Sequence, residues 1–308
     1  MSATLVFAQL LNGLQYGVLL FLLAAGLTLV FGIMNFVNLA HGSLYMMGAY
    51  FAASAFNFTG SFGWSVAAAM LGTLLLGFAL EVVAVARLYR RDHLDHVLAT
   101  FGLVMFFNEF VRFFWGPQPL FLPVPEWLSG TLEIAGLRYS AYRFSIIIVG
   151  LLVAMASWFL ITKTRMGMLI RAGSVNPVMI AALGVNIRLL NAMLFALGAM
   201  LAGLAGAMAG PILSVQSGMG ESVLITTLVV IVIGGIGSVS GAFYAALIVG
   251  VVDTMGRVFL TTVLRQITER SFADAAGPAL ASMLVYLLMA IILAWRPQGL
   301  FPANRGHH

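Results

Sequence analysis

Few residues in this 308-residue sequence could do chemistry, and their spacing matches no catalytic motif. There is no cysteine, no HExxH pair for a zinc ion, and no GxxxxGK[ST] loop for the phosphates of ATP. The segment GSVSG has valine where a nucleophilic serine would stand. His93 and His96 lie in a basic segment, where a solvated surface explains them better than metal binding. We therefore expect no catalysis, no metal site and no cofactor in this chain.

A second group of polar residues is embedded in apolar sequence near the start of the chain. Asn35, Asn38 and His41 fall within GIMNFVNLAHGSLYMMGAY, residues 32–50. A polar side chain at membrane depth needs either a bonded partner or a water-filled cavity. Packing against a partner and lining a solute path both remain open. We take these three residues as candidates for a translocation path.

The charged residues inside apolar segments suggest pairing rather than ion transport. Asp253 and Arg257 are four residues apart, so we expect them to neutralise each other. Glu221 stands near the start of an apolar segment, where the helix dipole favours an acidic residue. Neither carboxylate suggests a relay across a membrane.

The composition excludes a soluble protein. Hydrophobic residues make up 62% of the chain, charged residues only 8%, and the mean hydropathy is +1.05. A soluble domain carries roughly 25% charged residues. The net charge of +5 is spread over short loops rather than gathered on one face, so nucleic acid is not an expected partner. We predict a polytopic membrane protein surrounded by lipid.

The apolar segments predict an all-α bundle of about eight to ten spans, in a single transmembrane domain over residues 1–308. Residues 116–140 contain four prolines and are too broken to cross the membrane, so we expect them to form an external cover. The nine expected spans are residues 5–31, 39–56, 64–86, 96–110, 142–161, 192–213, 223–235, 242–260 and 278–295.

Basic residues predict the orientation. Clusters at residues 87–91, 163–188 and 296–305 fall on one side when the nine spans alternate. Excess Lys and Arg in short loops indicates the cytoplasm. We therefore expect the carboxyl terminus and the 163–191 loop to be cytoplasmic. Arg257, Arg265 and Arg270 disagree, because alternation places them outside.

The basic loop KTRMGMLIRAGSVNPVMIAALGVNIRLLN, residues 163–191, has its own helix signals. Asn176 and Pro177 form a cap with proline at the first helical position. We expect a short helix over residues 178–183, ended by Gly184. Such a helix could dock a soluble partner or form an ordinary amphipathic surface turn, and the residues alone leave both open.

Glycine-rich breaks suggest an internal duplication. Residues 32–42 and 234–241 are followed by the similar tails GSLYMMGAY and GAFYAALIVG. Broken helices at matching places in two halves are typical of duplicated transporters. However, alternation places both breaks on one side, which an inverted duplication forbids. For the GxxxG pairs, such as Gly206 and Gly210, packing within the chain is the favoured interpretation.

Four motifs carry a family resemblance. NLAHGSLYMMGAY, TRMGMLIRAGSVNPVMIAALGVNIRLLN, GGIGSVSGA and RPQGLF occur in that order. Together they resemble the inner-membrane permease subunits of branched-chain amino-acid ABC importers, from about Leu10 to Leu300. The long loop motif is similar to the family segment that docks on the ATPase. Its matching positions are Arg171, Asn176, Pro177, Ala181, Ala182 and Gly184.

The resemblance implies a type II-like ABC importer working by alternating access. It would contain two permease chains, two ATPase chains that bind ATP and Mg²⁺, and a periplasmic substrate-binding protein. The second permease could be a second copy or a related chain. The solute would be leucine, isoleucine or valine, although urea, amides and other amino acids are carried by similar systems. The alternative is a stand-alone cation-coupled secondary transporter of a small polar solute, for which only Asp253 and Glu221 offer carboxylates.

Overall fold

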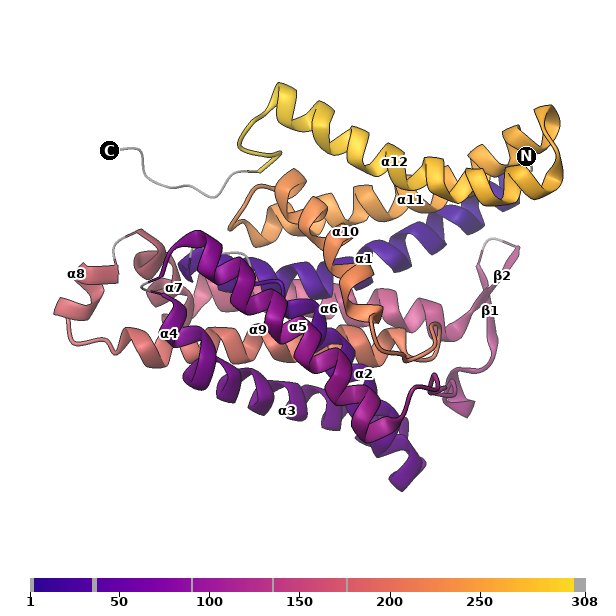
Figure 1. Cartoon of the computed structure of the whole chain (residues 1–308). Helices are drawn as coiled ribbons and strands as arrows, with labels where there is room; N and C mark the ends of the chain where they lie inside the picture. Colours follow the sequence, from indigo (N-terminus) through magenta and orange to yellow (C-terminus); the bar gives the residue numbers. More distant parts are fainter. Residues whose placement is uncertain (1–2, 35–37, 90, 135, 176, 302–308) are drawn as a thin grey trace.

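Long apolar helices build almost the whole fold. The computed structural model describes residues 3–34, 38–89, 91–134, 136–175 and 177–301 (Figure 1). The long helices are α1 (Ala3–Met34), α2 (His41–Thr59), α3 (Phe62–Leu80), α5 (His93–Trp115), α6 (Ala141–Lys163), α9 (Ile187–Ala209), α10 (Met219–Gly234), α11 (Val239–Ile267) and α12 (Arg270–Trp295). A π-helical turn (Glu81–Val85) and α4 (Ala86–Leu88) continue α3, and α7 (Arg165–Val175) and α8 (Pro177–Ala182) join α6 to α9.

Seven helices in the described part of the chain are long and apolar enough to cross a membrane. They are α1, α3 with its extension, α5, α6, α9, α11 and α12. The two other expected spans are α2, which carries His41, Ser43 and Asn57, and α10, which has 16 residues. Both pack among the long helices rather than outside them. The prediction of an all-α polytopic bundle is confirmed.

Two parts of the chain differ most clearly from the expectation. Helix α12 begins at Arg270, not at Pro278, and runs through the proline. It can do so because Gly277 lies directly against Thr261, so α12 packs closely along α11 through this turn. The 116–140 loop also contains an antiparallel hairpin of β1 (Thr131–Ile134) and β2 (Leu137–Ser140), which its prolines did not suggest.

Helices α1 and α9 form the centre of the bundle. In an 18-residue apolar window of each, 83% of the residues are buried inside the chain, against 22% or less for the other five long apolar helices. α1 packs along α11, α9 and α6, while α9 packs along α3, α2 and α1. The outer helices therefore keep their apolar outer faces uncovered by the chain, as expected for helices that contact lipid.

The helices around this centre follow an approximate two-fold arrangement. The packing of α1 along α11 corresponds to the packing of α9 along α3. Likewise, the contact of α2 with α5 corresponds to the contact of α10 with α12. Gly42 of α2 faces Gly220 of α10, so closely that a methyl group on either would clash with the backbone of the other. Because α1 and α9 run in opposite directions (Figure 1), α1–α2–α3 and α9–α10–α11 are related as an inverted repeat.

This repeat is not the one that the similar tails suggested. The similar tails predict that residues 32–42 and 234–241 are equivalent. However, the first break joins α1 to α2, whereas the second joins α10 to α11. The counterpart of the first break is the α9–α10 connection, residues 210–218. The tails therefore do not occupy equivalent positions. Because the two breaks are not counterparts, their placement on one side of the membrane does not conflict with an inverted repeat.

Two of the sequence motifs, GGIGSVSGA and RPQGLF, meet in space. The last carbonyl groups of α10 have no partner within the helix. The amide of Leu300 donates to the Ile233 carbonyl at 2.8 Å, and the amide of Phe301 donates to the Gly234 carbonyl at 3.0 Å. Gly235 has φ 101°, which glycine adopts at little cost. The closing segment thus caps α10 where the chain turns into α11.

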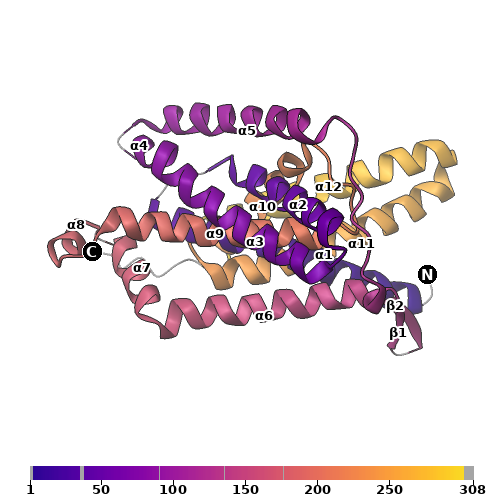
Figure 2. The same ribbon diagram turned by 90° about the horizontal axis from the view of Figure 1, so that it is seen from below.

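The bundle has two distinct ends (Figures 1 and 2). We call the end that carries α4, α7 and α8 the α8 end. The opposite end, with β1, β2, the start of α1 and the α11–α12 connection, is the hairpin end. Arg265 lies at the hairpin end and binds Asp274 at 2.7 Å, and Arg257 binds Asp253 at 2.8 Å. Two of the three arginines that disagree with the predicted orientation are therefore in ion pairs, although the orientation rule gives acidic partners little weight.

Candidate functional site

The segment predicted to dock a partner projects from the α8 end. α7 starts after a single residue, Thr164, whose hydroxyl accepts a hydrogen bond from the Gly167 amide at 3.1 Å. A side chain at Gly167 would clash with the carbonyl groups of Leu160 and Ile161, so the turn from α6 into α7 requires glycine. The chain then leaves the bundle axis: α7 packs against α6 and α1, and α8 projects beyond the packed helices (Figure 1).

α8 ends as the sequence predicted, with a complete glycine cap. Gly184 adopts φ 87°. Its amide donates to the Ala181 carbonyl at 3.0 Å, and the Val185 amide donates to the Ile180 carbonyl at 3.3 Å. This pair of hydrogen bonds defines a Schellman motif. The helix occupies residues 177–182 rather than 178–183, so Pro177 is its first residue.

The outer surface of α8 is apolar and uncovered. Ala181, Ala182 and Gly184 are exposed, and Leu183 is 77% exposed. A Cβ atom at Gly184 would meet nothing within 4 Å in this chain. Ile180, by contrast, is 6% exposed, so its side chain packs α8 against the rest of the chain. α8 is thus held firmly on one side and open on the other.

A small apolar cluster ties this segment to the centre of the bundle. Ile170 of α7 packs with Leu190 and Leu194 of α9, and Leu160 of α6 joins them. Asn186 caps α9 by accepting a hydrogen bond from the Leu189 amide at 3.1 Å. Because α9 is one of the two central helices, a displacement of α7 and α8 would reach the core directly. Arg171 is exposed on α7, and Asn176 lies outside the described residues.

The path candidates lie in the interior. His41 and Asn38 are both fully buried, and Asn35 lies outside the described residues. Asn38 Oδ1 accepts a hydrogen bond from the Ala40 amide at 3.0 Å, so this side chain helps to start α2. The Leu23 backbone lies near the His41 ring, but neither ring nitrogen has a hydrogen bond of normal geometry among the described residues. Nε2 lies 3.0 Å from where a Cβ on Gly26 would stand. His41 is therefore inserted beside the central α1–α9 crossing.

A buried carboxylate that sequence reasoning missed lies near the α8 end. Glu81 is 2% exposed and opens the π-helical turn that follows α3. Its Oε1 accepts a hydrogen bond from the Tyr89 hydroxyl at 2.7 Å, and the same hydroxyl lies 3.3 Å from Met34 Sδ. Burial and the neighbouring carboxylate raise the pKa of Tyr89. An acidic residue inside the apolar run GFALEVVAVA was the available signal.

Two further acidic residues singled out in the sequence, Asp253 and Glu221, have polar partners, and the first has the partner expected for it. Arg257 donates two hydrogen bonds to Asp253, at 2.8 and 2.9 Å. Glu221 lies in the first turn of α10 and accepts a hydrogen bond from the side chain of Asn108. Among the described residues, no three His, Asp or Glu side chains gather into a metal-binding group.

The inverted repeat, the crowded centre and the exposed short helix together define a polytopic membrane transport protein. A family model described as the permease component of branched-chain amino acid transport systems matches residues 9–293. The chain belongs to this family. Because members of this family are permease components of transport systems, the match contradicts the alternative of a stand-alone secondary transporter.

Relatives of known name match over 80% or more of their length. The chain is 28% identical to the high-affinity branched-chain amino acid transport system permease protein BraD of Pseudomonas aeruginosa, covering 95% of this chain and 94% of that protein. It is 29% identical to the corresponding LivH of Escherichia coli K12, covering 94% and 96%. It is also 22% identical to a probable branched-chain amino acid permease of Methanocaldococcus jannaschii, covering 80% of each chain.

Proposed function

We propose that this chain forms the transmembrane path of an ATP-driven importer for branched-chain or related amino acids. The observation that carries the proposal is the family match over residues 9–293. ATP and Mg²⁺ bind to a separate ATPase chain, and a periplasmic binding protein delivers the solute. A second permease chain, identical or related, completes the path. The chain itself contributes binding and movement, not catalysis.

The α7–α8 segment is the proposed contact with the ATPase. Its open apolar surface at Ala181, Ala182 and Leu183 suits docking of a soluble protein. The Schellman motif at Gly184 keeps the short helix rigid, so it can transmit force. The cluster of Ile170, Leu190 and Leu194 passes a displacement to α9. Pro177, Asn176 and Arg171 belong to the same proposed contact.

Closure of the ATPase pair would then rock the two halves of the inverted repeat about the α1–α9 crossing. Gly26 and Gly198 place these two backbones in direct contact, so the crossing can act as a pivot. His41 lies beside this pivot with no partner among the described residues. We include His41, Asn38 and Asn35 in the path that opens when the halves move, because a buried imidazole gains hydrogen bonds from entering water.

The α8 end is proposed to face the cytoplasm of a bacterial inner membrane. Exposed basic side chains at this end include Arg165, Arg171 and Arg188. Positive charge in short loops indicates the cytoplasmic side. The hairpin end would then receive the binding protein outside. This orientation places the docking segment where an ATPase is available.

Co-expression with the cognate ATPase, second permease and binding protein tests the proposal. The tagged chain is expected to bring the ATPase with it during purification, and reconstituted vesicles should take up leucine only with ATP and binding protein. Leucine uptake by this chain alone, driven by an ion gradient, would contradict the proposal. ATP-dependent uptake of urea or an amide in place of leucine would change the solute class and keep the importer.

A further inference from the structure

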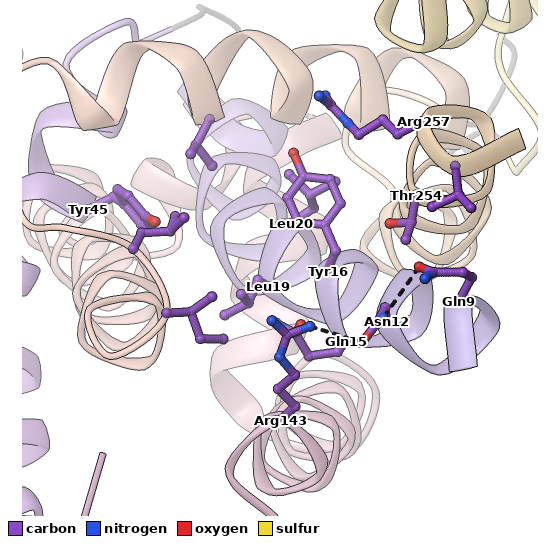
Figure 3. A pocket seen from close by; sticks show the side chains of 14 residues that line it. Gln9, Asn12, Gln15, Tyr16, Leu19, Leu20, Tyr45, Arg143, Thr254 and Arg257 are labelled. Carbon is purple, nitrogen blue, oxygen red and sulfur yellow. Dashed lines mark hydrogen bonds between the residues drawn. The ribbon is translucent and has the colours of Figure 1, made fainter. Parts of the chain in front are cut away.

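A cavity of about 360 Å³ opens in the half of the bundle nearer the hairpin end (Figure 3). It lies between α1, the first turn of α6, α11 and the chain that follows α9. Its volume falls within the range of about 300 to 1,000 Å³ typical of small-molecule sites. The path candidates Asn38 and His41 do not line it. It is therefore a site distinct from theirs.

The cavity lining includes a cation with spare hydrogen-bond donors. Arg143 Nη1 donates to Asn12 Oδ1 at 2.9 Å, and Asn12 Nδ2 donates to Gln9 Oε1 at 3.3 Å (Figure 3). Within the described residues Arg143 forms no ion pair, and a guanidinium has five N–H donors. Arg257 differs, because Asp253 already neutralises it. Arg143 is thus the group with capacity for an added carboxylate.

Aliphatic side chains form much of the remaining lining. They come from α1, from the turn after α9, and from α10 and α11, and they are Leu19, Leu20, Ile212, Leu213, Val223 and Val258. Tyr16, Tyr45, Thr254 and Arg257 complete the lining. A lining that combines the Arg143 cation and amides with branched aliphatic side chains suits a small molecule that carries both a carboxylate and a branched alkyl group.

We propose that this cavity is a binding station for the transported solute, an aliphatic amino acid whose carboxylate is held by Arg143. In this assignment the side-chain amides of Gln9 and Gln15, which line the same cavity, accept from its ammonium group, and the aliphatic residues hold its side chain. The proposal rests on the proposed function and assigns residues to it. Gln9, Asn12 and Tyr16 follow helical spacing in the first span, so the polar face of α1 contributes to this binding station.

The absence of native cysteine allows a direct binding test on the assembled importer in vesicles. Thr254 lines the cavity, so Thr254→Cys provides a single thiol there. Its rate of maleimide labelling is measured with leucine and with leucinol, which lacks the carboxylate. Leucine is expected to slow labelling at least five-fold, and leucinol to have less than half that effect. Adding Arg143→Gln should remove the protection by leucine.

Arg138→Gln is the matched control. Arg138 lies five residues from Arg143 at the same end, but its side chain is 80% exposed and contacts Glu133 of the hairpin. This variant should keep full protection by leucine. Equal protection by leucinol, or protection that survives Arg143→Gln, would overturn the assignment of the carboxylate to Arg143. No protection by leucine in a complex that imports leucine would overturn the binding station while leaving the proposed function standing.

Discussion

Gly26 of α1 and Gly198 of α9 meet backbone to backbone at the centre of the bundle. A Cβ atom on Gly26 would stand 2.5 Å from the Gly198 carbonyl oxygen, and one on Gly198 would stand 2.8 Å from the Gly26 carbonyl oxygen. Neither distance leaves room for a methyl group. The two central helices, one from each half of the repeat, therefore approach as closely as helices can.

Gly198→Ala should destabilise the protein. The added methyl group must push α1 and α9 apart, and overpacking of this kind costs about 1–3 kcal/mol. Thermal unfolding of the purified protein in detergent measures the effect. Gly102→Ala is the control, because a Cβ atom there meets nothing within 4 Å and alanine favours a helix. Equal melting temperatures for the two variants would show that the crossing has room.

Tyr89→Phe should also lower stability, through a different cause. It removes the hydroxyl that donates to Glu81 at 2.7 Å and leaves a buried carboxylate without that partner. We expect a loss of about 1–3 kcal/mol. Glu81→Gln in the same chain should recover part of the loss, since a neutral amide is cheaper to bury than a charge. If Tyr89→Phe is as stable as the native chain, the pair contributes little.

The His41→Leu variant tests whether His41 lines the solute path or only packs in the interior. The ring has no hydrogen-bond partner among the described residues, so an apolar side chain leaves no described donor or acceptor unpaired. We expect normal yield, normal assembly with the ATPase and leucine uptake reduced several-fold. His41→Asn should retain more uptake than His41→Leu because it keeps a polar group. Normal uptake by His41→Leu would remove this residue from the path.

The orientation is testable with single cysteines at the two ends. Ser174 belongs to α7 at the α8 end, and Ser129 is exposed at the hairpin end. An impermeant maleimide added to intact spheroplasts should label Ser129→Cys at once and Ser174→Cys only after lysis. The reverse pattern would place the α8 end outside and would exclude contact with a cytoplasmic ATPase.

Local signals in the sequence predicted local structure well. Asn-Pro and Gly184 marked the start and end of α8 within one residue, and the spacing of Asp253 and Arg257 predicted their ion pair. These features depend on residues only a few positions apart. The positive φ at Gly184 follows from the end of the helix itself, without reference to the rest of the fold.

Features that depend on distant contacts were missed. The inverted repeat rests on crossings such as Gly42 with Gly220, and sequence similarity between the tails indicated a different pairing. The cavity joins Asn12 to Arg143 across 131 positions, although the polar spacing in the first span was visible. Helix α12 passes through Pro278 because its packing on α11 outweighs the local preference to break.

The central claim is that α8 couples this permease to an ATPase, and Gly184→Val tests it most directly. Valine opposes φ 87° and adds bulk to a surface that is open in this chain. The backbone strain costs about 1–2 kcal/mol, which the fold should survive. Gly136→Val is the matched control, because Gly136 has φ 80° and open surroundings but lies in the hairpin at the other end.

The measurement is ATP hydrolysis stimulated by solute-loaded binding protein, with each variant assembled in vesicles. The account predicts that Gly136→Val retains stimulation close to that of the native chain. It predicts that Gly184→Val loses at least 90% of the stimulation and retains less ATPase on purification. Native stimulation in Gly184→Val would contradict the account, because α8 could not then be the element that couples the two proteins.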